Sequence, residues 1–510
     1  MTYQDPGQPT STKPTHSKKA RKSRAKRLRR SALLIALVLI VLAGSFYLYA
    51  MFRFNQINKV GVSSLSQTVG SQPFNILLVG DNTRTGLNPA QAKYFGSAAQ
   101  VGGGRSDVTM IAHFDPANST VSLVSIPRDL FMPIPNSKTA NRVDDALNVS
   151  PEQLVKTIEN DLGIPIQRYV ELNFDSFQNV VNALGGVKMY FPMPVKDAYS
   201  GLNVKTPGCK LLNGFQALEL VRARHLYYYQ NGVWTEDPLG DLSRIRRDHE
   251  FLKVLASQVK AQGLLNPLEI NSIIGGVTKY LTVDSGFTLS DMISIAEQFR
   301  NVSLSSTPTV TLPIALVNNF VYDNANYGDV VFPAQPQDQQ VIDKYLGLSV
   351  PKISTSTITV SVMNGSGTYD QATQVSQSLR ALGYQIATVG NATVRSTPAE
   401  TIIRYTPGHQ QQAEVLLNSL SGAVVMGLVP HTATGAPIEL VTGTGLVVAS
   451  PPSTASSSPA STSPTTAASS TTGAKVAQPS NTTAVTAPIS LPATQYNQPL
   501  QPWDPRACPS

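Results

Sequence analysis

The sequence predicts an α/β or α+β fold in which helices cover a central sheet, followed by a smaller α/β unit and preceded by one transmembrane helix. Three observations support this prediction. Strand-like and helical segments alternate through the middle of the chain. An apolar run of membrane-spanning length lies near the N-terminus. Near the C-terminus the composition shifts to Ser, Thr, Pro and Ala.

The N-terminal residues 1–30 form a basic tail. They carry ten Lys or Arg and one acid, a balance of +9, while the whole chain carries +8. The other 480 residues therefore sum to −1, so the body is nearly neutral. This excludes a uniformly basic, nucleic-acid-binding body, and the tail suits the anionic face of a membrane.

Residues 31–52 are predicted to form the transmembrane helix. The 21 residues 32–52 carry no charge, which is about the length that crosses a bilayer. Tyr47 and Tyr49 lie near the outer end, as interfacial aromatic residues do. The positive-inside rule predicts a type II cell-membrane protein with a cytoplasmic N-terminus and extracytoplasmic catalytic and C-terminal domains. The alternative, a cleaved signal peptide, is opposed by the length of the run and the lack of a small-x-small site.

The rest of the chain divides by composition into five parts. These are a polar linker at 53–72, a folded region at 73–346, a second linker at 347–357, a compact unit at 358–446 and a disordered tail at 447–510. The tail is too poor in apolar residues to bury a core. Cys209 and Cys508 could pair, but their spacing leaves this open.

Strand and helix signals are clear in both folded parts. One helix, 150–163, has Ser150 as N-cap, Pro151 at its first position and Gly163 at its end. The other expected helices are 175–184, 213–221 and 242–261, and in the compact unit 372–383 and 408–420. The expected strands are 74–80, 106–114 and 119–127, and in the compact unit 358–365, 384–390, 401–407 and 437–443.

Arginines at strand ends and in loops are the main functional signal in region 73–346. They are Arg84, Arg105, Arg128, Arg222, Arg224, Arg244 and Arg247. Arg222 and Arg224 reach one face if the segment is extended, and Arg244 and Arg247 are expected to share a helix face. The planar fork of arginine suits phosphate, and several converging forks need an anion to neutralise them.

Acidic residues are interleaved with these arginines. They are Asp81, Asp107, Asp129 and Asp241. Carboxylates beside phosphate-binding arginines can hold Mg²⁺ or take a proton from an attacking hydroxyl. Any single Arg–Asp pair could instead be a structural salt bridge. The set as a whole, placed at strand ends, favours an anion-binding site.

Ordered motifs in this region resemble the LytR-CpsA-Psr family. They are NILLVG…TRTG, GGGRSDVTM, VSLVSIPRDLFMPIP, LNGFQALELVRARH and DLSRIRRDHEFL. The resemblance covers residues 73–265 and continues weakly to 345. The unit at 358–446, with VMNGSG, LGY and IIRY, resembles the LytR C-terminal domain often attached to this family. The membrane anchor and the tail fit its actinobacterial members.

The resemblance implies a mixed central sheet flanked by helices and a phosphotransferase in cell-wall biogenesis. Such enzymes move a glycopolymer from an undecaprenyl-pyrophosphate carrier to the C6 hydroxyl of N-acetylmuramic acid in peptidoglycan, at the membrane and without nucleic acid. The implied pyrophosphate-binding residues are Arg105, Arg128, Arg222, Arg224 and Arg244, joined by Arg84 and Arg247. The implied catalytic residues are Arg128, Asp107 and Asp81, and the two aspartates are expected to bind Mg²⁺ or another divalent cation.

Two positions depart from the family pattern. Where the family has Gly-x-Asp-x-Arg, this sequence has Asn82, with Asp81 one residue earlier. Asp81 either reaches the same ion or leaves a weaker metal site. Asp248 stands where the family often has Gln, and it could pair with Arg244 four residues earlier.

Alternative functions remain open from the sequence. The same arginines could release the glycan to water, which would make the protein a polyprenyl-pyrophosphate-glycan hydrolase. A non-enzymatic wall-binding or regulatory role is also possible, although no helix-turn-helix is visible. The aromatic segment from Tyr227 to Trp234 is either a rim that touches sugar or lipid, or an ordinary packed loop.

Overall fold

The computed structural model describes residues 37–38, 40–41, 44–45, 47–49, 51–67, 72–84, 103–135, 140–261, 280–303, 306–322, 325–393, 400–450, 489–490 and 497–509. Residues 1–56 and 57–510 form two separate units. The basic tail and much of the predicted anchor lie outside the described residues. Within the described part, no helix has both the length and the apolar character needed to cross a bilayer.

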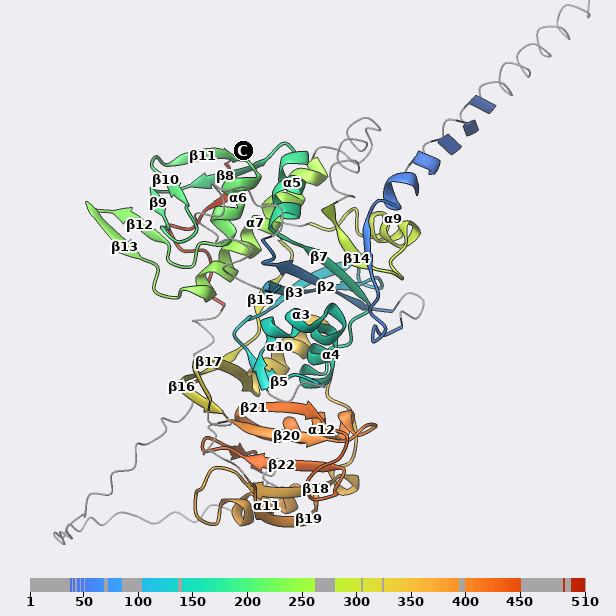
Figure 1. Ribbon diagram of the computed structural model, residues 1–510, viewed down its shortest axis with the longest axis vertical. Coiled ribbons are helices and arrows are strands. Elements are labelled where there is room, and N and C mark those ends of the chain that lie inside the picture. The colour runs from blue at the N-terminus through green and yellow to red at the C-terminus, as the bar shows by residue number, and fades with distance from the viewer. Residues whose placement is uncertain are drawn as a thin grey trace, which may run out of the picture. The chain divides into compact units, whose positions relative to one another are not determined.

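A seven-stranded mixed sheet forms the centre of the larger unit (Figure 1). In spatial order its strands are β1 (Asn58–Val60), β14 (Thr282–Asp284), β7 (Arg168–Leu172), β2 (Phe74–Asp81), β3 (Ser106–Asp115), β4 (Thr120–Ile126) and β15 (Thr309–Thr311). β2 runs parallel to β7 and antiparallel to β3. The predicted mixed α+β class is therefore confirmed.

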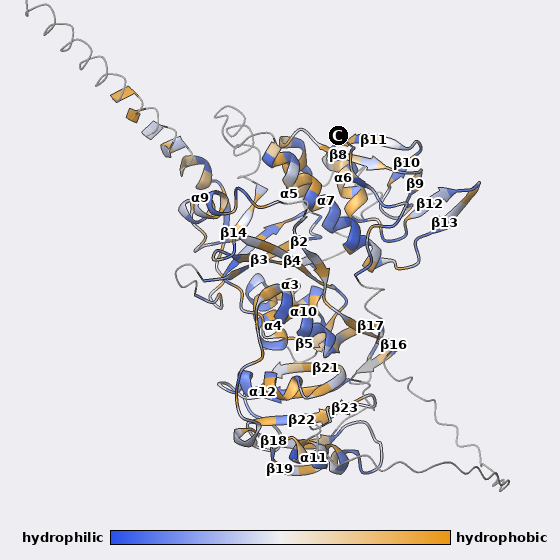
Figure 2. Ribbon diagram, turned by 180° about the vertical axis from the view of Figure 1, so that it is seen from behind, coloured by the Kyte–Doolittle hydropathy of each residue, from blue (hydrophilic) through white to orange (hydrophobic). Residues whose placement is uncertain are grey.

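Helices cover both faces of this sheet (Figure 1). On one side lie α3 (Val143–Val149), α4 (Pro151–Leu162) and α10 (Gln337–Leu346), and on the other lie α5 (Phe174–Ala183), α6 (Gly214–Val221) and α7 (Asp241–Ala261). Leu77 and Ile111 join the core under α3 and α4. The neighbouring Leu78 and Met110 face the helices α5 to α7 instead, because side chains alternate along a strand. Figure 2 shows hydrophobic colour along these inner strands.

Helix α4 begins and ends as its sequence predicts. The Ser150 side chain accepts a hydrogen bond from the backbone N–H of Gln153, and Pro151 occupies the first helical position. Gly163 follows the last residue with φ 68°, a left-handed conformation that favours glycine. These local signals account for where the helix begins and ends.

A second sheet joins the C-terminal region to the first. Its path is β19 (Gln385–Asn391), β18 (Thr359–Asn364), β22 (Ile438–Thr442), β20 (Thr401–Tyr405), β21 (Leu420–Leu428), β17 (Ala325–Gln335), β16 (Ile314–Tyr322) and β24 (Ile489–Ser490). The sequence did not predict β21, which pairs with β17 from the first region. Val350 and Ile353, in the predicted linker 347–357, pack on the C-terminal core, which also contains α11 (Gln371–Ala381) and α12 (Gln410–Leu417).

Residues 497–509, which we call the C-terminal strap, contradict the prediction that the tail is disordered throughout. Cys508 forms a disulfide with Cys209, which settles the question that the spacing left open. In the strap, β25 (Arg506–Ala507) pairs antiparallel with β8 (Val187–Phe191). The tail composition predicted disorder, but these last residues gain a disulfide, a strand pairing and buried contacts with α7.

Gly214 begins α6 where this helix passes α5. A Cβ atom added there would lie 2.1 Å from the carbonyl oxygen of Gln178, a backbone atom that cannot easily move. We expect Gly214→Ala to lower the free energy of unfolding by about 1–3 kcal/mol, as overpacking does. The check is urea unfolding of the full chain against Gly61→Ala, where no atom lies within 4 Å of the new Cβ. Equal midpoints for the two variants would contradict the expected clash.

Candidate active site

An apolar chamber lies between the central sheet and helices α5 to α7. It holds about 870 Å³ of empty space, counted with its open mouth. Leu78, Met110 and Val170 line the sheet side, and Phe174 and Phe251 line the helix side. Polar groups enter the lining mainly at one end, through Asp81, Asp107, Arg222, Arg244 and Asp248. The chamber therefore suits an apolar chain that carries a charged group at one end.

A polar chamber holds about 490 Å³ of empty space, counted with its open mouth, and adjoins the apolar one. It is lined by Asp107, Arg128, Tyr199, Ser200, Arg222, Arg224, His225 and Arg244. Asp107, Arg222 and Arg244 line both chambers, so the two meet at these side chains. The sequence did not single out Tyr199, Ser200 or His225. The sequence offered a hint for His225 alone, because it directly follows the predicted site residue Arg224.

Asp107, on β3, is the carboxylate at this meeting point. Its Oδ1 accepts a hydrogen bond from Arg128 Nη1 at 2.7 Å, and Arg222 Nε lies 4.0 Å from its Oδ2. Arg244 Nη1 donates to the Asp107 backbone oxygen at 2.8 Å. Burial alone would raise the pKa of Asp107, but the fields of Arg128, Arg244 and Arg222 hold it below its usual range. The carboxylate therefore stays ionised.

Arg244 is buried on α7 and is held by acidic neighbours. Its Nε lies 3.0 Å from Asp241 Oδ1, and its Nη1 lies 3.8 Å from Asp248 Oδ2. The Asp248 contact matches the pairing expected from the sequence. Burial raises the pKa of Asp248 to about 7, against the opposing fields of Arg244 and Arg247. Arg224, which is 41% exposed, reaches Asp241 at 3.9 Å and closes the polar chamber on that side.

The predicted arginines Arg84 and Arg105 lie outside the two linings. The buried Arg84 Nη1 donates to the Asn82 backbone oxygen at 2.8 Å, and its guanidinium lies 5.7 Å from the Phe174 ring centre. Arg105 is 53% exposed and pairs with Asp145 at 3.4 Å. Among the described residues, neither is found in the walls of the polar chamber.

The prediction that Arg247 shares a phosphate-binding helix face with Arg244 is wrong. Its side chain is almost fully buried and lies 3.0 Å from Asp237 and 3.6 Å from Asp504 of the C-terminal strap. Its Nη2 donates to the Ala223 backbone oxygen at 2.5 Å. The two arginines are three residues apart, but Arg247 serves the packing of α7 and Arg244 faces the chambers.

Asp81 and Asn82 lie where the family pattern has a single aspartate, and their side chains have different surroundings. The Asn82 amide connects two neighbouring groups by hydrogen bonds. Its Nδ2 donates to Asp107 Oδ1 at 3.4 Å, and its Oδ1 accepts from the Arg105 backbone N–H at 3.1 Å. Asp81 lines the polar end of the apolar chamber. Burial raises the pKa of Asp81, despite hydrogen bonds from Thr83, and the charge of Asp107 adds to this.

Asp81 and Asp107, which line the same chamber, are the carboxylates of this site that a divalent cation could use. Within the described residues, no group of three or more His, Cys, Asp or Glu could hold a metal ion on its own. Mg²⁺ commonly binds one or two carboxylates and takes its remaining ligands from water and substrate phosphate. The raised pKa of Asp81 indicates a buried carboxylate whose charge a cation would offset. Asp81 and Asp107 are therefore the described residues that would hold Mg²⁺ if a ligand supplied the other donors.

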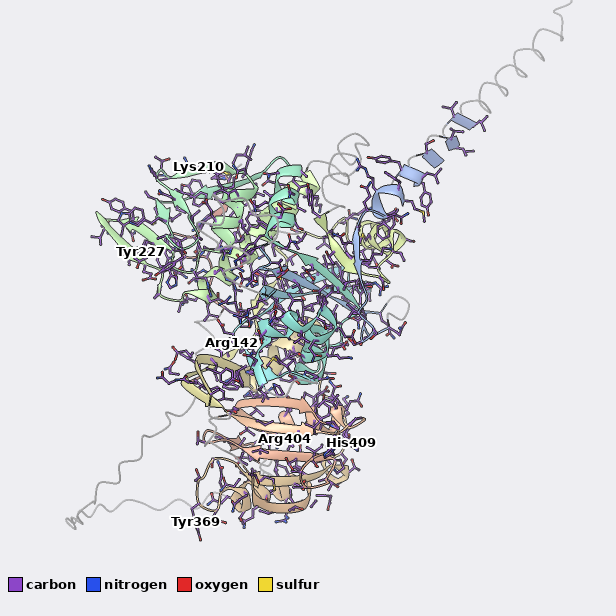
Figure 3. All side chains as sticks on the ribbon, in the orientation of Figure 1. Arg142, Lys210, Tyr227, Tyr369, Arg404 and His409 are labelled. Carbon is purple, nitrogen blue, oxygen red and sulfur yellow. A yellow bond between two sulfur atoms is a disulfide. The ribbon has the colours of Figure 1, made fainter. Side chains whose placement is uncertain are left out.

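The aromatic segment of the sequence forms an exposed hairpin of β12 (Tyr227–Gln230) and β13 (Val233–Glu236). Figure 3 labels Tyr227 on this hairpin. Lys196 Nζ lies 4.1 Å from the centre of the Trp234 ring, and Tyr228 stacks on Trp503 of the strap at 4.2 Å. Part of the segment is therefore packed, as expected of an ordinary packed loop, and part is exposed.

Comparison with protein-family models gives two matches, which together cover most of the chain. The model described as the LytR_cpsA_psr family matches residues 51–344, more than half of the chain. The chain belongs to the LytR-CpsA-Psr family. A second model, described as LytR cell envelope-related transcriptional attenuator, matches residues 357–445. The resemblance seen in the sequence motifs is confirmed for both regions.

Relatives in this family carry cell-wall names. The chain is 29% identical over 285 residues to the probable cell wall biosynthesis protein LcpB of Corynebacterium glutamicum, covering 56% of this chain and 64% of that protein. It is 29% identical over 232 residues to the teichoic acid transferase TagU of Enterococcus faecalis, covering 45% of this chain and 67% of that protein. The match to LcpB thus spans less than two thirds of the relative's length.

Solved structures in the family include a LytR-Csp2A-Psr enzyme from Actinomyces oris. It is 22% identical to this chain, with a TM-score of 0.44, and the match covers 57% of this chain and 95% of that one.

Proposed function

We propose that the protein is a phosphotransferase that moves a glycopolymer from an undecaprenyl-pyrophosphate carrier to the C6 hydroxyl of N-acetylmuramic acid in peptidoglycan. The meeting of an apolar chamber with an arginine-lined chamber at Asp107 is the observation that carries the proposal. A polyprenyl chain fits the first chamber, and its pyrophosphate then lies among Arg128, Arg222 and Arg244. The cell-wall names of the relatives favour the same class of substrate.

The reaction asks the protein mainly to position groups and to stabilise charge. Phosphoryl transfer places negative charge on the non-bridging and leaving oxygens, and arginine forks stabilise it. Arg128 and Arg244 are held by carboxylates, so their guanidinium groups are oriented before the substrate arrives. Asp81 and Asp107 would hold Mg²⁺ against the pyrophosphate, which would reduce its repulsion of an incoming hydroxyl. The leaving group is the polyprenyl monophosphate.

An exported, membrane-anchored location belongs to this proposal. The basic tail and the apolar run 32–52 would keep the N-terminus inside and place the site beside lipid-linked donors. The Cys209–Cys508 disulfide supports export, because disulfides persist in oxidising compartments. Activated pyrophosphate donors also supply energy where ATP is absent.

The test is product analysis with the full-length chain. The donor is an undecaprenyl-pyrophosphate disaccharide with a labelled sugar, and the acceptor is a peptidoglycan oligomer, both supplied with Mg²⁺. We expect a phosphodiester-linked glycan on the acceptor and release of the lipid monophosphate, with little release when the acceptor is omitted. Equal release with and without acceptor would identify a hydrolase instead.

A further inference from the structure

His225 lies at the rim of the polar chamber and has no role in the function proposed so far. It follows Arg224 in the loop after α6 and lines the chamber together with Asp107 and Arg128. Its side chain is 54% exposed, so an incoming acceptor can reach it. Histidine is the side chain best suited to proton transfer near neutral pH.

Asp197 fixes the backbone on both sides of this rim. It is 1% exposed, and its Oδ2 accepts a hydrogen bond from the His225 backbone N–H at 2.8 Å. Its Oδ1 accepts from the backbone N–H groups of Tyr199 at 2.8 Å and Ser200 at 3.2 Å. One buried carboxylate therefore holds His225 and the facing loop in register.

Glu236 fixes the direction of the His225 ring. Its Oε1 lies 3.1 Å from His225 Nδ1, and its Oε2 accepts a hydrogen bond from the Tyr227 hydroxyl at 2.8 Å. These hydrogen bonds, first from Tyr227 and then from His225, lower the pKa of Glu236, so it stays ionised and accepts the Nδ1 proton. The neutral ring then carries its lone pair on Nε2. The centre of the Tyr199 ring lies 4.8 Å from the centre of the imidazole.

Other groups near the chamber are poorer proton acceptors. Asp107 is bound to Arg128 at 2.7 Å, and its pKa is held low by the surrounding arginines. Asp241 is committed to Arg244. Asp144, whose pKa burial raises to about 6, lies on α3 and is not among the described residues that line the chamber. His225 is the described chamber residue that combines an available lone pair with an orienting partner.

We propose that His225 is the general base of the transfer, with Glu236 as its positioning residue; this assignment rests on the proposed function. The acceptor hydroxyl oxygen forms a bond to the phosphorus that carries the glycan, and its proton passes to His225 Nε2. The bond from that phosphorus to the bridging oxygen breaks. The bridging oxygen leaves with the electron pair as part of the polyprenyl monophosphate. Oriented bases of this kind, held by a third group, recur in nucleophilic catalysis.

The test compares the full-length wild type with His225→Ala in the transfer assay. We expect kcat to fall by about 10²–10³-fold, while KM for the donor stays within about threefold, because a base acts in the chemical step. The fall in kcat on acidification, which reports protonation of the base, should disappear in the variant. Added imidazole should restore part of the rate. Glu236→Gln, which keeps the ring in place, should lose about tenfold.

The matched control is His431→Ala, which changes an exposed histidine of the C-terminal region and should leave kcat unchanged. A kcat for His225→Ala within twofold of wild type would overturn the assignment. A loss that appears only in donor KM, without rescue by imidazole, would also overturn it. In both cases wild-type transfer leaves the proposed function standing, whereas a wild-type chain that transfers nothing overturns both proposals.

Discussion

Arg128→Met is expected to lower kcat/KM for glycan transfer by about 10³-fold, the scale seen when a donor to transition-state charge is removed. Arg128 lines the polar chamber and donates to Asp107 at 2.7 Å. The substitution removes a guanidinium that can donate two hydrogen bonds to phosphate. It also removes the positive charge that neutralises Asp107. The pKa of Asp107 should rise as a result, because the field of Arg128 helps to lower it. The measurement is steady-state transfer by the full-length chain, with folding checked by circular dichroism.

Two further variants make this result specific. Arg128→Lys keeps the charge but loses the planar fork, so it should recover only part of the rate. Arg168→Met removes an arginine of similar exposure that pairs with Asp291 at 3.5 Å, outside both chambers, and should transfer at nearly the wild-type rate. An Arg128→Met rate close to that of Arg168→Met would refute the phosphate-binding role.

Asp504→Ala is expected to lower the free energy of unfolding by about 3–5 kcal/mol, the usual cost of removing one partner from a buried ion pair. Asp504 is fully buried in the C-terminal strap, and its Oδ2 lies 2.7 Å from Arg246 Nε. Its Oδ1 lies 3.6 Å from Arg247. Without Asp504, both arginines would have to share Asp237 alone.

The strap can also be released at its disulfide. Cys508→Ser should cost about 2–5 kcal/mol, because the bond to Cys209 closes a long loop in the unfolded chain. Urea unfolding of the full chain measures both variants. Asp343→Ala, on the exposed side of α10, is the control and should change stability by less than about 0.5 kcal/mol. If neither strap variant differs from this control, the strap contributes no stability.

The fold was predictable where local signals and core periodicity agree. Helix α4 has recognisable cap residues in the sequence at both ends, and β2 and β3 are apolar runs of strand length. β21 was missed because its segment, with Gly422 and Gly427, has weak local strand character. Its pairing with β17 depends on a partner about 90 residues earlier, which no local pattern reveals.

The site was predictable in its residue types more than in its geometry. The sequence identified Arg128, Arg222 and Arg244, and these surround Asp107. The sequence could not show that Arg244 and Arg247 have different roles, because their spacing allows a shared helix face. Only their tertiary partners distinguish the two side chains. Asp504, which pairs with Arg247 away from the chambers, lies in a segment whose composition gave no sign of folded structure.

Oxidation gives the strap a further consequence. The bond between Cys508 and Cys209 ties the segment that carries Asp504, the buried partner of Arg246 and Arg247, to the body of the protein. Reduction of this bond would release the tie and loosen the packing of α7, the helix that carries Arg244. The order of the site is therefore expected to depend on the redox conditions around the protein.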